Sequence, residues 1–157
     1  MTVTVRPVTA ADEAQWRARW EKYNIFYKRT VPENVTANTW RRFLDDKIPS
    51  YAAVAVDDAK PEGDNIIGFV TFLPHMFTGS IEDQVYLGDL YVDDEARNGG
   101  AGRKLIEYVY DWARQHDIYS VYWHTQHFNH RAQLLYTKVA DKTDFVQYGK
   151  SIKGEKK

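Results

Sequence analysis

The residues best suited to chemistry form a glycine-rich turn at residues 97–102, Arg-Asn-Gly-Gly-Ala-Gly. Three glycines in four positions permit backbone conformations and close approaches that a Cβ atom would block. The apolar spacing after the turn is typical of an amphipathic helix, whose first N–H groups have no partner within the helix. Such a helix start favours anions, and Arg97 and Arg103 would add donors suited to phosphate. The turn therefore indicates a phosphate site, with a connection that serves packing alone as the other interpretation.

The pattern of the turn separates it from two common phosphate loops. It lacks the Gly-Lys-Ser/Thr ending of a P-loop, and no Gly-x-Gly-x-x-Gly directly follows the preceding strand pattern. It resembles motif A of the GNAT superfamily of N-acetyltransferases, Arg/Gln-x-x-Gly-x-Gly/Ala, which Arg97, Gly100 and Gly102 match. Downstream, residues 129–136 match the family's Asn-x-x-Ala-x-x-Leu-Tyr helix.

Within the superfamily the chain most resembles the small fungal histone and D-amino-acid N-acetyltransferases. The resemblance is carried by residues 120–123, Ser-Val-Tyr-Trp, by residues 129–136, and by Lys138 with Val139. That branch has Val-Gly-aromatic after the tyrosine helix, whereas this chain continues with Val, Ala and Asp at 139–141, so the turn there can differ. Members acetylate histone lysines, polyamines or free D-amino acids, and the resemblance therefore specifies the donor better than the acceptor.

The resemblance implies acetyl-coenzyme A as co-substrate. The backbone of residues 90–92 would pair with the pantetheine arm beside a bulge, and the amide near Val92 would polarise the thioester carbonyl. Tyr136 would protonate the departing thiolate, while Asn129 would orient the arm or a water molecule, or act only as a helix N-cap. The implied catalytic residues are Tyr136 and Asn129. The implied cofactor-binding residues are Leu90, Tyr91, Val92, Arg97, Asn98, Gly99, Gly100, Ala101, Gly102, Arg103, Asn129 and Tyr136.

The proton acceptor is the part of the pattern that the sequence does not match. An ordinary lysine-like amine has a pKa of about 10.4 and is charged at neutral pH, so a group must take its proton. Many family members use a glutamate on the central strand, where this chain has Gly88 or Tyr86. Strand alternation turns Asp89 away from that face unless a bulge rotates it. His75, Glu82 and a chain of water molecules remain alternatives.

The acceptor side is expected along the first helix. Its aromatic residues at positions 16, 20, 23 and 27 form a stripe that is typical of a core, although in the family this helix and the next loop line the acceptor pocket. Our acceptor-side candidates are Trp20, Tyr23, Phe26, Tyr27, His75, Glu82, Tyr86 and Asp89. Aromatic and acidic groups suit a small amine, a polyamine or a histone tail. A D-amino acid would also need a cation, such as Lys28, Arg29, Arg41 or Arg42. We favour a small amine or an amino acid.

The elements that must position these residues follow from periodicity and turn signals. Strands are expected at residues 3–6, 51–56, 66–73, 84–92, 118–124 and 143–152, with Pro74 ending the third. Helices are expected from the Thr-x-x-Asp start at residue 9, at 36–47, at 103–115 and after Asn129. The resemblance implies an α+β GNAT fold in three layers, with a mixed, mostly antiparallel sheet of about six to seven strands and about four helices.

Composition limits the remaining possibilities. The length of 157 residues fits one domain, expected at 1–152 with a frayed basic tail at 153–157. A net charge of −1 gives no broad attraction to nucleic acid or to a membrane. No cysteine is available for a disulfide, a nucleophile or a thiolate metal site, and His124, His127 and His130 lack a completing carboxylate, so no metal is expected. The N-terminus shows no signal peptide, and we expect a cytoplasmic protein, with the nucleus as a second compartment.

Taken with the resemblance, these features predict an acetyl-coenzyme A-dependent N-acetyltransferase. The acceptor would be a primary amine on a small amine, a polyamine, an amino acid or a histone lysine, attacking directly in a ternary complex. The alternative is a non-catalytic acyl-coenzyme A sensor or interaction module of the same fold, which the missing strand glutamate keeps open. The resemblance further implies a homodimer.

Overall fold

The computed structural model describes residues 2–154. The chain divides into two compact units, Met1–His124 and Thr125–Lys157, and each is described by itself. The last residues of the basic tail expected at 153–157 lie outside the described part of the chain. A single domain over residues 1–152 stays a prediction.

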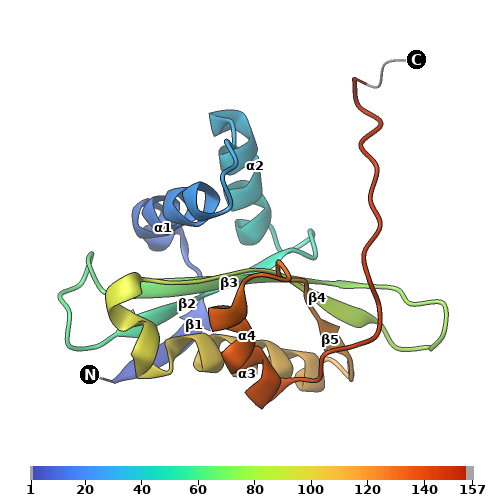
Figure 1. Ribbon diagram of the computed structural model, residues 1–157. Coiled ribbons are helices and arrows are strands. Elements are labelled where there is room, and N and C mark those ends of the chain that lie inside the picture. Colours follow the sequence, from blue (N-terminus) through green and yellow to red (C-terminus); the bar gives the residue numbers. More distant parts are fainter. Residues whose placement is uncertain (1, 155–157) are drawn as a thin grey trace. The chain divides into compact units, whose positions relative to one another are not determined.

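A five-stranded sheet in the order β1-β2-β3-β4-β5 forms the centre of the N-terminal unit (Figure 1). Its strands are β1 (Val3–Pro7), β2 (Tyr51–Asp57), β3 (Ile66–His75), β4 (Gln84–Val92) and β5 (Val121–Tyr122). Neighbouring strands are antiparallel, except that β4 and β5 are parallel. The short β5 pairs with β4 through Val85 and Tyr86, so the ladder between these two strands ends before residues 87–92.

Helices lie on both faces of this sheet (Figure 1). On one face are α1 (Glu13–Phe26) and α2 (Glu33–Leu44), preceded by the short 3₁₀ helix η1 (Ala10–Asp12). On the other face is α3 (Ala101–Gln115), which follows a second 3₁₀ helix, η2 (Asp94–Gly99). The apolar stripe of α3 is buried through Leu105, Ile106 and Val109. This confirms the amphipathic pattern after the glycine turn.

The aromatic stripe of α1 packs mainly as core. Trp16 is fully buried, and its ring lies 5.4 Å from that of Trp20 and 6.2 Å from that of Phe69 on β3. Trp40 from α2 adds a third indole at 5.1 Å from Trp16. Large aromatic surfaces removed from water in this way hold α1 and α2 against the sheet.

Several elements differ from the sequence prediction. The sheet has five strands rather than six or seven, because residues 118–124 contribute two strand residues and residues 143–152 form no strand. Extended chain becomes a strand only where a ladder partner is present, which local propensity does not report. Pro74 does not end β3; it pairs with Val85 near the strand end, where its missing N–H is tolerated. Helix α2 both starts and ends earlier than predicted, with Pro32 directly before its first turn.

The C-terminal unit contains α4 (His130–Val139). Asn129 is its N-cap, and the Asn129 side-chain oxygen accepts a hydrogen bond from the Ala132 amide at 3.4 Å. Residues 140–154 form neither helix nor strand, and Phe145, Val146 and Tyr148 are at least 77% exposed. Within the described residues, no helix is long and apolar enough to cross a membrane.

Candidate functional site

A β-bulge at Gly88 decides which side chains of β4 face α1 and α2. Thr71 pairs with Asp89 and Phe72 pairs with Leu87, so Gly88 is an extra residue without a partner in β3. An extra residue resets the strict alternation of a strand. Tyr86 and Asp89, three positions apart, therefore both reach the same pocket. The condition stated from the sequence, that a bulge must rotate Asp89 for it to face this side, is met.

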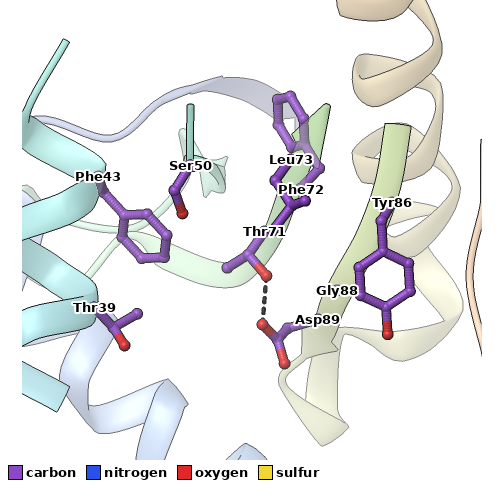
Figure 2. A pocket seen from close by; sticks show the side chains of 9 residues that line it. All are labelled: Thr39, Phe43, Ser50, Thr71, Phe72, Leu73, Tyr86, Gly88 and Asp89. Carbon is purple, nitrogen blue, oxygen red and sulfur yellow. Dashed lines mark hydrogen bonds between the residues drawn. The ribbon is translucent and has the colours of Figure 1, made fainter. Parts of the chain in front are cut away.

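The pocket is open and has a volume of about 260 Å³. It is lined by Thr39, Phe43, Ser50, Thr71, Phe72, Leu73, Tyr86, Gly88 and Asp89 (Figure 2). In Figure 2 the Thr71 hydroxyl donates a hydrogen bond to Asp89 Oδ2. The bond fixes one oxygen of the Asp89 carboxylate. An apolar wall with a few convergent polar groups is the usual composition of a small-molecule site.

Three tyrosines surround the Asp89 carboxylate and remain neutral. The pKa of Tyr23 is raised, first by burial and then by the negative charge of Asp89. The pKa values of Tyr27 and Tyr86 are raised in the same direction and for the same two leading causes. A phenol that is hard to ionise can donate a hydrogen bond near a carboxylate without adding a second negative charge.

Arg29 supplies a positive charge beside Asp89. Its Nη2 atom lies 3.7 Å from Asp89 Oδ1. The sequence offered Lys28, Arg29, Arg41 and Arg42 as possible cations without distinguishing them, and the structure brings Arg29 to the carboxylate. Arg41 instead donates a hydrogen bond to Asn38 on the exposed side of α2.

The other acceptor-side candidates lie in different surroundings. Trp20 is buried and donates through Nε1 to Thr36 Oγ1 at 3.0 Å, which links α1 to α2. Phe26 is 53% exposed at the end of α1. The His75 ring is placed between the Tyr122 hydroxyl, 2.7 Å from Nε2, and the Met76 carbonyl, 2.9 Å from Nδ1. Glu82 is exposed in the loop between β3 and β4. None of these four side chains lines the pocket around Asp89, and neither does Tyr23 or Tyr27.

The glycine turn forms the start of α3. Gly100 has a φ of +81°, a left-handed conformation that L side chains rarely adopt, and it is the N-cap of the helix. The first intrahelical bond runs from the Lys104 amide to the Gly100 carbonyl, at 3.1 Å, so the preceding amides point out of the helix end. Arg97 pairs with Asp94 at 2.7 Å and Arg103 with Glu107 at 3.0 Å, both at the surface. Asn98 and Gly99 are exposed in the same turn, whereas Ala101 is buried.

A buried ion pair ties α1 to the strand end before this turn. Arg19 Nη2 lies 3.1 Å from Asp93 Oδ2, and the Asp93 side chain is 2% exposed. The Asp93 amide donates to the Ile67 carbonyl at 2.8 Å, which fixes the chain where β4 ends. Burial, followed by the charge of Asp93, raises the pKa of Tyr91 to about 12. Tyr91 is therefore neutral at physiological pH.

The donor-side features are compatible with a bound acyl-coenzyme A. Leu90, Tyr91 and Val92 lie on β4 beyond its last pair with β5, so their backbone on that side is outside the ladder. An extended amide-containing chain can add to such an edge. The left-handed Gly100 and the start of α3 form a cradle for an anion at the end of the same strand.

Asn129 and Tyr136, the two candidate catalytic residues, belong to α4 in the C-terminal unit. Asn129 caps the helix, as one of the two interpretations expected, and its Nδ2 also approaches Thr125 Oγ1 at 3.4 Å. Tyr136 is half-buried in the second turn of α4. Its catalytic role stays a prediction.

Sequence reasoning did not identify three polar residues that line the pocket: Thr39, Ser50 and Thr71. Thr71 lies among apolar residues of β3. Strand alternation predicts that the side chains of Thr71 and Phe72 point to opposite faces of the sheet, but it does not indicate which face holds a site. Thr39 and Ser50 carry no signal in the local sequence. Among residues 2–154, no group of three or more His, Cys, Asp or Glu side chains is arranged to hold a metal ion.

Comparison with known proteins identifies the family and the fold. Residues 12–140 match the acetyltransferase (GNAT) family. The chain is 44% identical over 146 residues to the D-amino-acid N-acetyltransferase HPA3 of Saccharomyces cerevisiae, covering 93% of this chain and 89% of the yeast protein. It resembles the crystal structure of a probable acetyltransferase with a TM-score of 0.80, at 22% identity over 99% of this chain and 100% of the other. The structure of AAC(6')-Iy with the bisubstrate analogue CoA-S-monomethyl-acetylneamine gives a TM-score of 0.79, at 17% identity over 96% and 99% of the two chains.

Proposed function

The chain belongs to the acetyltransferase (GNAT) family, and from this membership we propose that it transfers the acetyl group of acetyl-coenzyme A to the amino group of a small primary amine. The observation that carries the acceptor side is the bulge at Gly88, which brings the Asp89 carboxylate into a pocket of about 260 Å³. The name of the yeast relative, a D-amino-acid N-acetyltransferase, supports an amino acid as the acceptor.

Asp89 is the proposed proton acceptor for the substrate amine. The amine attacks as the neutral base, and a carboxylate in a partly apolar pocket can bind the ammonium form and take up its proton, directly or through one water molecule. The hydrogen bond from Thr71 holds the carboxylate in position. This role replaces that of the strand glutamate, whose place Gly88 or Tyr86 occupies.

The donor side is proposed to use two backbone features and one phenol. Bound acetyl-coenzyme A supplies an activated acyl carbon and a thiolate leaving group. The amides at the start of α3 and the side chains of Arg97 and Arg103 would hold its phosphates, while the edge of β4 at Leu90 to Val92 would hold its pantetheine arm. From the resemblance, Tyr136 provides a proton to the leaving sulfur and Asn129 orients the arm.

The test is thiol release from acetyl-coenzyme A, with mass spectrometry of the products, across amines of different classes. The panel contains D- and L-amino acids, spermidine, an aminoglycoside and a histone-tail peptide. We expect thiol release together with an N-acetylated small amine. Coenzyme A binding with no acetylated product from any class would instead support the sensor, the alternative that the sequence kept open.

We also propose a homodimer in which the segment 143–152 contributes to the contact. Phe145, Tyr148 and Ile152 are at least 76% exposed within one chain, and exposed apolar side chains of this size commonly mark interaction sites. Light scattering of the full chain, beside a variant in which these three residues are replaced by serine, tests this. A monomer at all concentrations for the unmodified chain would contradict it.

A further inference from the structure

We infer that Arg29 binds the acceptor's carboxylate and that Arg29 and Asp89 together select an α-amino acid. This inference rests on the proposed function and names the acceptor class of the same site.

The C-terminus of α1 holds the Arg29 backbone in a Schellman motif. Lys28 adopts a left-handed φ of 54°. The Lys28 amide donates to the Ile25 carbonyl at 2.9 Å, and the Arg29 amide donates to the Asn24 carbonyl at 3.0 Å. These two bonds satisfy carbonyls of the last turn and set the direction in which the chain leaves the helix.

The Arg29 side chain is held on two further sides. Its Nε atom donates to Asn24 Oδ1 at 2.5 Å, and Asn24 is buried. Its guanidinium carbon lies 5.6 Å from the ring centre of Trp20 and 5.4 Å from that of Tyr23, within the range of cation–π contacts. The Nε atom and the planar face of the guanidinium are therefore already in contact with the protein. The terminal Nη atoms lie on the edge of the group toward Asp89. A guanidinium fixed in this way loses little freedom when it binds a carboxylate.

Arg29 and Asp89 form a loose ion pair. At 3.7 Å, Nη2 and Oδ1 are too far apart for a hydrogen bond. Asp89 Oδ2 is occupied by Thr71, whereas the Arg29 side chain is 46% exposed. An α-amino acid carries its ammonium and its carboxylate on a single carbon atom. It can therefore bind with its ammonium next to Asp89 and its carboxylate next to Arg29. Charge-assisted bonds of this kind are stronger than those between neutral groups.

The same arrangement disfavours the other acceptor classes. A polyamine would bring a second cation close to Arg29, and a lysine within a peptide has no carboxylate near its amine. Apolar side chains line the pocket beside Asp89, including Phe43, Leu73 and Tyr86, which suits an amino acid with an apolar side chain. Phenylalanine is therefore a suitable probe.

The experiment compares three probes that differ at one group: phenylalanine, phenylalaninamide and phenethylamine, with both enantiomers of the first two. Acetylation is followed by thiol release for the wild type, Arg29→Gln, Arg29→Lys and the matched control Arg41→Gln on the exposed side of α2. For Arg29→Gln we expect the KM for phenylalanine to rise about 30-fold or more. The kcat for phenylalanine should change less than about 3-fold, and so should the KM for phenylalaninamide and for phenethylamine, which lack the carboxylate. Arg41→Gln should behave as the wild type.

The outcomes separate this inference from the function on which it rests. If the wild type releases thiol with amines, and Arg29→Gln weakens phenylalanine and phenethylamine equally, Arg29 does not bind the carboxylate and the inference is overturned. If the wild type acetylates no amine, the proposed function fails first. Should Arg29→Gln not fold, as judged by thermal unfolding, Arg29→Lys decides: it keeps the charge but loses the planar fork, and its KM for phenylalanine should rise about 10-fold.

Discussion

Thr71 and Asp89 are opposite one another on β3 and β4, and the Thr71 hydroxyl donates to the Asp89 carboxylate. The register shift that pairs them is the bulge at Gly88. Without the extra residue, Asp89 would lie on the α3 face with Leu87 and Phe72 as near neighbours, where an unpaired carboxylate is unfavourable. The bulge thus places a carboxylate in this pocket, although the chain has Gly88 or Tyr86 where the resemblance expects a strand glutamate.

Asp89→Asn should lower kcat for amine acetylation by about 100-fold, because it removes the proton acceptor and keeps the shape of the side chain. The matched control is Asp64→Asn, an exposed aspartate in the turn between β2 and β3. Steady-state thiol release measures both variants. Equal rates for Asp89→Asn and the wild type would show that a different group, or solvent, takes the proton.

Gly100→Ala and Gly100→Glu form a matched pair. Both place a side chain at a φ of +81°, with no atom within 4 Å of the new Cβ, so both should lose about 1 kcal/mol of unfolding free energy through backbone strain alone. Only the glutamate adds negative charge at the proposed phosphate cradle. We expect its dissociation constant for coenzyme A, measured by calorimetry, to exceed that of the alanine variant by about 10-fold or more. Equal affinities in the two variants would place the phosphates elsewhere.

Asp12 should make stability depend on acidity. Arg6 donates to its carboxylate at 2.7 and 2.9 Å and the Thr9 amide donates at 2.8 Å. These bonds, chiefly that from Arg6, lower the pKa of Asp12 below 3.8. A lowered pKa means that this contribution is fully present above the unfolded-state value and is lost as the pH falls through the folded-state value.

Asp12→Asn tests this link between acidity and stability. At pH 7 it should reduce the free energy of unfolding by about 1 to 2 kcal/mol. The difference from the wild type should shrink as the pH is lowered below about 4. Urea titrations at pH 7 and pH 3 measure it, and a difference that is the same at both pH values would rule out the proposed linkage.

Tyr136→Phe should slow acetyl transfer about 10- to 100-fold, because the leaving sulfur loses its proton donor while the ring is kept. Coenzyme A affinity should stay within about 3-fold of the wild type, since the phenol acts on the leaving group rather than on binding. Single-turnover thiol release and calorimetry separate the two quantities. An unchanged rate would remove Tyr136 from the mechanism.

The conformation of the turn that is expected to bind the donor was accessible from the sequence because it depends on local chemistry. Arg97, Gly100 and Gly102 are close in the chain, and the left-handed conformation of Gly100 is one that glycine adopts readily. The apolar period of residues 101–115 and the continuous strand at residues 84–92 likewise determined α3 and β4. The N-cap role of Asn129 follows in the same way from its position one residue before α4.

The surroundings of Asp89 were decided by contacts between residues distant in the sequence. Asp89 faces the pocket because β3 and β4 slip by one residue at Gly88, and strand alternation alone predicts the opposite face. Arg29 was one of four cations in the sequence; contacts with Asn24, Trp20 and Tyr23 single it out and bring it to Asp89. The sequence predicted the glycine turn through adjacent residues, whereas strand register and helix packing, which are set by the whole core, decided that Arg29 and Asp89 lie together.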